Sequence, residues 1–155
     1  MEIKIVLLLT LLLYTIIVSQ SLSYIISLRN VQQHLNAPAY IAFRKLTDKN
    51  FNAKFRYVIY ASLFANLLLL VMCSIHFSGL LFTGVVISFV ALLTDTLFAV
   101  KGNMPINTII NTWTPEQYPS NWADYRTAWM KIFSIRQALN ITGFISLLAA
   151  AIFSK

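Results

Sequence analysis

Charged residues are scarce in this chain. Only 11% of its 155 residues are charged, and 58% are hydrophobic. A soluble domain of this size carries a charge at about a quarter of its positions. The composition therefore argues against an ordinary soluble domain and indicates an integral membrane protein that folds as one unit.

Cysteine and histidine are nearly absent. The single cysteine, Cys73, lies inside an apolar run, so we expect neither a disulfide nor a thiolate metal site. The two histidines, His34 and His76, are predicted on opposite membrane faces, which excludes a bis-His haem within one chain. The sequence also lacks a Walker loop and the GxGxxG, GxSxG and HExxH motifs. We therefore predict no metal and no cofactor.

Acidic residues are few, and basic residues outnumber them. Twelve Lys and Arg against five Asp and Glu give a net charge of +7. In a nucleic-acid-binding protein such an excess would lie on a soluble face with few apolar runs, so we expect no nucleic-acid partner. In a membrane protein it marks the loops that stay in the cytoplasm.

Long apolar runs are what the chain does have. A helix needs about 20 apolar residues to cross the hydrocarbon core, and four segments have that length: residues 3–27, 55–75, 80–100 and 128–153. We predict an all-α fold, a single transmembrane four-helix bundle with a cytoplasmic cap of short interfacial helices. The first segment also resembles a signal peptide, but the lack of an A-x-A-like cleavage site favours a retained helix.

The basic residues are concentrated on one side of the predicted bundle. The long connections, 29–54 and 101–122, fall on one membrane face, and the short turn 76–79 and both termini fall on the other. The first face carries Arg29, Arg44, Lys45, Lys49, Lys54, Arg56, Lys101, Arg126 and Lys131, and the second carries Lys4 and Lys155. By the positive-inside rule, we predict a multi-pass protein of the cell (inner) membrane with both termini outside the cytoplasm.

The first long connection carries the signals of a short helix at the membrane surface. Asn36 is expected to cap it and Pro38 lies in its first turn. Aromatic and basic residues then alternate, which is typical of a helix at the headgroup level. Such a helix either only sets the topology or contacts lipid or substrate.

The second long connection is divided by glycine and proline. Gly102 is expected to end the third membrane helix, Pro105 to begin a short helix, and Pro115 to stop it. Asn121 and Asp124 have the spacing of an acidic capping box. We therefore predict a last helix over residues 122–153, about 48 Å long at 1.5 Å per residue.

Polar residues of the four predicted membrane helices converge in their cytoplasmic half. Gln20, Asn66 and Asp95 belong to the first three helices. In the fourth, Arg126, Trp129, Phe133, Arg136 and Asn140 share a face about 80° wide. This convergence predicts a pocket. The alternative is helix packing, which commonly places small and polar residues at membrane interfaces.

Asp95 and Arg136 are the hardest of these residues to assign to packing. A charge at membrane depth costs about 2.5–3.5 kcal/mol. The two side chains either neutralise each other as a structural pair or are catalytic charges in the pocket. His34 precedes the predicted surface helix and is the candidate general base at the pocket mouth.

Two motifs carry a resemblance to a known family. The sequence has M-P-I-N at residues 104–107, a downstream Trp113, and R-x-x-W-x-x-x-F-x-x-R at residues 126–136. This order resembles the four-helix integral membrane family that includes the anthrone oxygenases. The family has a P-x-N element after its third helix and an R-x-x-W…R pattern that enters its fourth.

The resemblance implies roles for several residues. Asn107 would orient the cap, and Arg126, Trp129 and Arg136 would line a substrate pocket. Many members carry a histidine where this chain has Phe133, which puts the oxidation chemistry in question. By the same motif, all of these residues could instead maintain the fold.

The leading hypothesis is a membrane pocket protein that binds or oxidises a hydrophobic ring compound without a cofactor. Gln20, Asn66 and Asn140 are its further candidate binding residues. The alternative is a non-catalytic membrane subunit or scaffold. We expect membrane lipid as a partner in either case, and an oligomer or larger complex stays open.

Overall fold

Four long helical rods make up the structure, a computed structural model that describes residues 2–74 and 79–154. The first three rods each contain a π turn (η), and the fourth is a single α-helix. In chain order the elements are α1 (Glu2–Ser23), η1 (Tyr24–Leu28), α2 (Arg29–His34), α3 (Ala37–Asn50), η2 (Phe51–Phe55), α4 (Arg56–Cys73), α5 (Leu80–Phe98), η4 (Ala99–Asn103), α6 (Met104–Thr112) and α7 (Trp122–Phe153). All four rods are long and apolar enough to cross a membrane. The prediction of an all-α fold with four helices long and apolar enough to span a membrane is thus confirmed.

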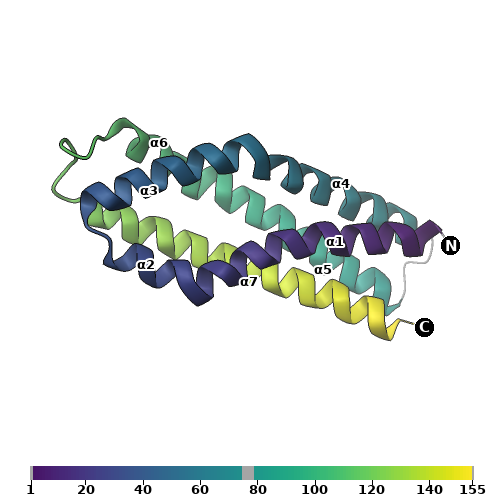
Figure 1. Cartoon of the computed structure of the whole chain (residues 1–155). Coiled ribbons are helices and arrows are strands. Elements are labelled where there is room, and N and C mark those ends of the chain that lie inside the picture. Colours follow the sequence, from purple (N-terminus) through teal and green to yellow (C-terminus); the bar gives the residue numbers. More distant parts are fainter. Residues whose placement is uncertain (1, 75–78, 155) are drawn as a thin grey trace.

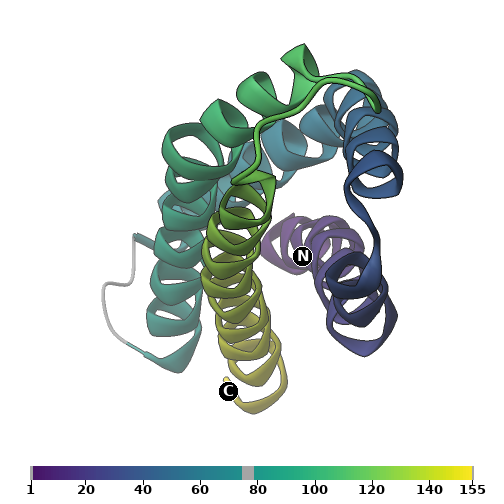
Figure 2. The same ribbon diagram turned by 90° about the vertical axis from the view of Figure 1, so that its left-hand side faces the viewer.

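The rods form an antiparallel bundle. Both termini lie at one end, and the α2–α3 and α6–α7 connections lie at the other (Figure 1). Seen end-on, α7 lies between the α5–α6 rod and the α1–α2 rod (Figure 2). The α4 helix completes the ring through its contacts with α1 and α5. The second predicted span ends at Ile75, which lies outside the described residues. Of the predicted turn at 76–79, only Gly79 is described.

The third rod does not end where the sequence predicted. Gly102 was expected to terminate a helix, but it lies inside η4 and the rod continues through α6 to Thr112. The glycine instead allows close packing, because a Cβ atom at this position would lie 2.9 Å from Cγ2 of Ile132 on α7. The predicted helix stop is therefore wrong, and Gly102 is a packing residue.

The second rod is also longer than predicted. Asn36 caps α3 as expected, since its side chain accepts a hydrogen bond from Ala39 N at 3.1 Å. The α3 helix then continues through η2 into α4, so it is not a separate short helix. It buries Tyr40 and Ile41 against residues of α6 and its C-cap, chiefly Ile110 and Trp113. A second small core thus forms at the end of the bundle away from the termini.

The fourth rod has the predicted bounds, Trp122–Phe153, but not the predicted cap. The Asn121 side chain makes no capping hydrogen bond. Its backbone (φ −89°, ψ 22°) is in a turn conformation, whereas a capping residue normally has an extended backbone. Only the Asn121 carbonyl is used, accepting from Asp124 N at 3.0 Å. The predicted capping box is therefore wrong.

The half of the bundle nearer the termini is filled with side chains. Its core contains Tyr14, Ile17, Val18, Leu69, Cys73, Val85, Leu92 and Leu147. Glycines bring the rods together here, as is common where membrane helices pack. At Gly84 an added Cβ would lie 2.8 Å from the carbonyl oxygen of Ser146, so α5 and α7 are in backbone contact.

We expect Gly84→Ala to destabilise the bundle by about 1–3 kcal/mol, because the new methyl group would push α5 away from α7. Unfolding in mixed micelles with increasing SDS measures the change. The matched control is Val90→Ile, which adds one carbon at an exposed position of the same helix. Equal stability of Gly84→Ala and Val90→Ile would contradict the close contact.

Candidate functional site

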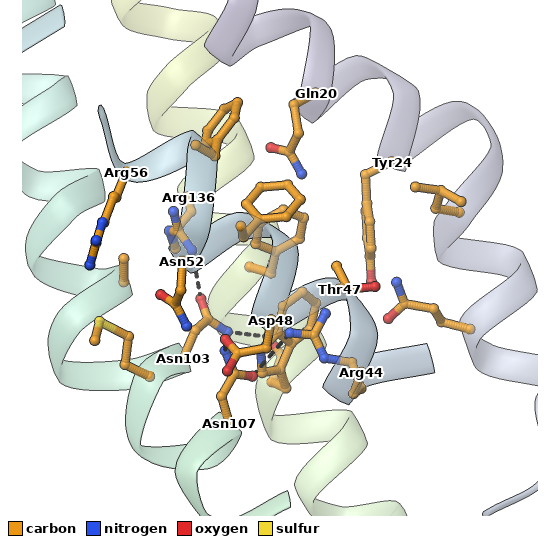
Figure 3. Close-up of a pocket in the computed structure, with 18 of the residues that line it drawn as sticks. Gln20, Tyr24, Arg44, Thr47, Asp48, Asn52, Arg56, Asn103, Asn107 and Arg136 are labelled. Carbon is orange, nitrogen blue, oxygen red and sulfur yellow. Dashed lines mark hydrogen bonds between the residues drawn. The ribbon is translucent and has the colours of Figure 1, made fainter. Parts of the chain in front are cut away.

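A pocket of about 280 Å³ lies between the filled core and the α3–α6 end of the bundle. Residues of all four rods line it, and each of the three π turns contributes side chains (Figure 3). Its lining comprises Gln20, Ser23, Tyr24, Leu28, Gln32, Phe43, Arg44, Thr47, Asp48, Phe51, Asn52, Phe55, Arg56, Ile59, Ala99, Asn103, Met104, Asn107, Trp129, Phe133 and Arg136.

The π turns explain why a space is left at this level. A π turn inserts an extra residue into a helix, so the side chains after it point in a new direction. Tyr24 at the start of η1 and Asn103 at the end of η4 both line the pocket. Single π turns of this kind are found often at functional sites. Three of them around one cavity mark this level of the bundle as the candidate site.

An ion pair closes the side of the pocket that faces the filled core. Arg136 Nε donates to Asp95 Oδ1 at 2.7 Å, and Asp95 is fully buried. Arg136 also donates through NH1 to Asn103 Oδ1 at 3.1 Å. The Asn103 amide in turn donates to the backbone oxygen of Trp129 at 3.0 Å. This network ties α5, η4 and α7 together, and it forms the predicted Asp95–Arg136 pair.

Stacked aromatic rings form one wall of the pocket. Trp129 and Phe133 are stacked with ring centroids 4.7 Å apart, and Tyr24 meets Phe133 edge-on at 4.6 Å. The Arg44 guanidinium lies 3.9 Å from the centroid of Trp129, and that of Arg136 lies 5.3 Å from Phe133. Two arginines thus contact the same aromatic pair, an arrangement that suits a planar ring with a polar substituent.

A second hydrogen-bond chain closes the far side of the pocket. Arg44 NH2 donates to Asn107 Oδ1 at 3.0 Å, and the Asn107 amide donates to Asp48 Oδ1 at 2.8 Å. The other oxygen of Asp48 accepts from Asn111 at 2.9 Å. Figure 3 shows Arg44, Asp48 and Asn107 grouped on this side, while Tyr24 extends towards them from the first rod. This chain fixes α3 against α6.

Several buried polar atoms of the pocket have no hydrogen-bond partner within the described residues. They are the donors Tyr24 OH, Arg44 Nε and Trp129 Nε1, and the acceptor Gln32 Oε1. An unsatisfied buried polar group costs about 1–3 kcal/mol. Half of the eight such atoms among the described residues belong to residues of this one cavity. Because unsatisfied buried groups are rare in native structures and require a reason, these four indicate a place for a polar ligand group.

The pocket brings together several of the residues that the sequence predicted for a substrate site. Asn107, Trp129 and Arg136 line it, as does Gln20 from α1. Asp95 lies behind Arg136 and does not itself line the cavity. It therefore positions the Arg136 guanidinium.

His34 and Arg126 lie outside the pocket. His34 is exposed at the end of α2, and its Nδ1 lies 2.8 Å from Asn30 O. It follows the pocket residue Gln32 by two positions, or about 200° around the helix, so it points away. Arg126 donates to Leu35 O at 3.0 Å and packs over Trp122. These contacts hold a carbonyl at the end of α2, as the alternative, fold-maintaining interpretation expects.

Asn66 and Asn140 are buried below the pocket. Asn66 donates to Ser62 O at 2.9 Å and accepts from Ser88 Oγ at 2.7 Å. That geometry is helix packing, as the alternative reading of the polar stripes expected. Asn140 lies one turn after Arg136, and its Oδ1 has no partner within the described residues. Neither residue lines the cavity.

Sequence reasoning missed Arg44, Asp48, Asn103, Tyr24 and Gln32. Arg44 and Asp48 were hidden in a segment that looked like a basic surface helix. A signal was present, because Tyr40, Arg44 and Asp48 recur every four residues and so share a helix face. An aromatic, a cation and an anion on one face are not typical of a uniformly basic membrane-surface helix.

The fold and site define a helical membrane bundle with an internal polar-aromatic pocket. Comparison of the chain with models of protein families, with curated proteins and with solved structures gave no match. Within residues 2–74 and 79–154 no cluster of His, Cys, Asp and Glu has the geometry to hold a metal ion. The function is therefore argued from the pocket.

We expect Asp95→Asn to cost about 3–5 kcal/mol of stability, because it leaves the largely enclosed Arg136 guanidinium without its counter-charge. SDS-induced unfolding measures this loss. The stability loss of the double variant Asp95→Asn/Arg136→Gln should be smaller than the summed losses of the two single variants, by about 0.5–3 kcal/mol. Lys131→Gln is the control, because Lys131 is an exposed cation on α7, the helix that carries Arg136. Strict additivity would show that the pair carries no coupling.

Proposed function

We propose that this chain is an integral membrane protein that binds a hydrophobic ring compound within its bundle. The observation that carries the proposal is the pocket of about 280 Å³ with six aromatic side chains in its lining. A dry cavity of about 150 Å³ holds benzene, so this volume suits a compound of more than one ring. Polar groups among the aromatic residues would fix the orientation of the compound, as in ligand sites generally.

The resemblance to the anthrone oxygenase family suggests a reaction class as well. A cofactor-free oxidation needs a base and a cation that stabilises a substrate carbanion. The resemblance assigns the cation to Arg136, which lines the pocket but is already paired with Asp95. The one carboxylate of the lining is Asp48, and both of its oxygens already accept hydrogen bonds. With Phe133 in place of a histidine, binding is better supported than turnover.

The distribution of charges supports a proposal for the membrane orientation. We propose that the end of the bundle formed by α2, α3, α6 and the start of α7 is a cytoplasmic cap, because nine basic residues belong to that half. Both termini would then lie outside the cytoplasm, in a multi-pass protein of the inner membrane. The pocket would lie where the hydrocarbon core meets the cap, a depth that a hydrophobic compound reaches from the lipid.

We expect multi-ring phenols and quinols to stabilise the purified protein. A compound present at a hundred times its Kd would add about 2.7 kcal/mol, which thermal unfolding in detergent detects. Ala99→Phe, which fills the pocket, should abolish the stabilisation. Ala128→Phe, exposed on α7 beside Trp129, should keep it. Oxygen uptake with the same compounds tests for oxidation. If no compound stabilises the protein and none is oxidised, the proposal fails and the scaffold alternative is favoured.

The orientation has its own test. A phosphatase reporter that is active only outside the cytoplasm should be active when fused after Lys155. The same reporter inserted after Glu116, in the α6–α7 connection, should be inactive. The reverse pattern would overturn the proposed topology without affecting the pocket.

A further inference from the structure

Arg44 and Arg136, the two pocket arginines that contact the aromatic wall, differ in how their charge is balanced. Arg136 has a carboxylate at 2.7 Å in Asp95, the one ion pair among the described residues. Arg44 is only 4% exposed, and no described carboxylate lies within ion-pair distance of it. Its nearest acid, Asp48, is reached through Asn107. The Arg44 guanidinium is thus buried with a neutral amide as its direct partner.

Cation–π contact compensates Arg44 only in part. Its guanidinium lies 3.9 Å from the Trp129 ring, a contact worth about 2 kcal/mol when desolvated. Removing a guanidinium from water costs several kcal/mol. A direct negative partner would offset the rest, and the pocket is the open space beside Arg44.

The unpartnered donors point to the same kind of group. Arg44, Trp129 and Tyr24 are all residues of the lining, and their Nε, Nε1 and OH atoms have no hydrogen-bond partner among the described residues. They outnumber the one unpartnered acceptor of the lining, Gln32 Oε1. An oxygen atom with several lone pairs and a negative charge would accept from these donors, and hydrogen bonds to ionised groups are the strongest.

The rest of the lining is suited to an apolar body. Phe43, Phe51 and Phe55 come from α3 and η2, on the rod that also carries Arg44. A ligand with a charged end and an aromatic body would place its charge at Arg44 and its rings among these phenylalanines.

We propose that the ligand is a ring compound that carries one ionised acidic oxygen group, a carboxylate or a phenolate, and that Arg44 binds that group. This rests on the proposed function, since it assigns the chemistry of the same pocket. Arg136, already paired with Asp95, contributes hydrogen bonds but not the unpaired charge. The Trp129 indole and the Tyr24 hydroxyl complete this anion-binding site.

The test compares probes that share a ring system and differ in charge. We use 9-anthracenecarboxylate, 9-anthraldehyde and 9-anthracenemethanol, titrated by anthracene fluorescence into the protein in a non-ionic detergent. The carboxylate should bind at least about tenfold more tightly than either neutral probe, because a hydrogen bond to a charged group is worth about 1.5–3 kcal/mol. Oleate, a carboxylate without rings, should bind more weakly than 9-anthracenecarboxylate.

Variants at Arg44 test whether this residue binds the anionic group. Arg44→Gln should weaken carboxylate binding about 10- to 100-fold and change the alcohol less than about threefold. Arg44→Lys, which keeps the charge without the planar donor fork, should fall between the two. Arg29→Gln, an exposed cation outside this pocket, is the control and should bind all probes like the wild type.

The outcomes separate this proposal from the proposed function. If the wild type binds the acid, the aldehyde and the alcohol equally, the anion-binding site is disproved but the ring-binding pocket is supported. If oleate binds more tightly than the anthracene acid, the anion-binding site is supported but a ring compound as the ligand is disproved. Absence of binding by every probe overturns both. These comparisons use the wild type alone, so they hold even if an Arg44 variant does not fold.

Discussion

The ion pair between Arg136 and the buried Asp95 is the constraint on which the site depends. It is expensive to bury, and only its mutual neutralisation makes it tolerable inside a membrane bundle. Once formed, it sets Arg136 against Asn103, which holds the backbone of Trp129. Trp129 then receives Arg44 on its face. Through this series of contacts, one charge pair in the core fixes the walls of a pocket that extends to α3.

The sequence predicts what helical register and the cost of buried charge determine. The four apolar runs, the cap at Asn36 and the bounds of α7 depend on local signals, and the structure has them all. The pairing of Asp95 with Arg136 was also predictable. Two charges at membrane depth on facing helices have few alternatives to each other.

The π turns are what the sequence did not reveal. Periodicity reasoning assumes 3.6 residues per turn, and an inserted residue shifts every later side chain by about 100°. Gly102 was read as a helix end, although it lies inside a continuous rod. Arg44 was missed for a related reason. The nearby cations Lys45 and Lys49 are partly or fully exposed, and the burial of Arg44 depends on its contact with Trp129, 85 positions later in the chain.

Phe133 supports the proposal of ligand binding rather than catalysis. It stacks on Trp129, meets Tyr24 edge-on and lies beneath Arg136, so it is held from three sides. A histidine there would bring a proton acceptor next to two guanidinium groups, whereas phenylalanine only completes the aromatic wall. The unpartnered donors around it lower the stability of the empty protein. Selection for stability alone would remove such groups, so their presence beside a wall with no base argues for a ligand that is held in place.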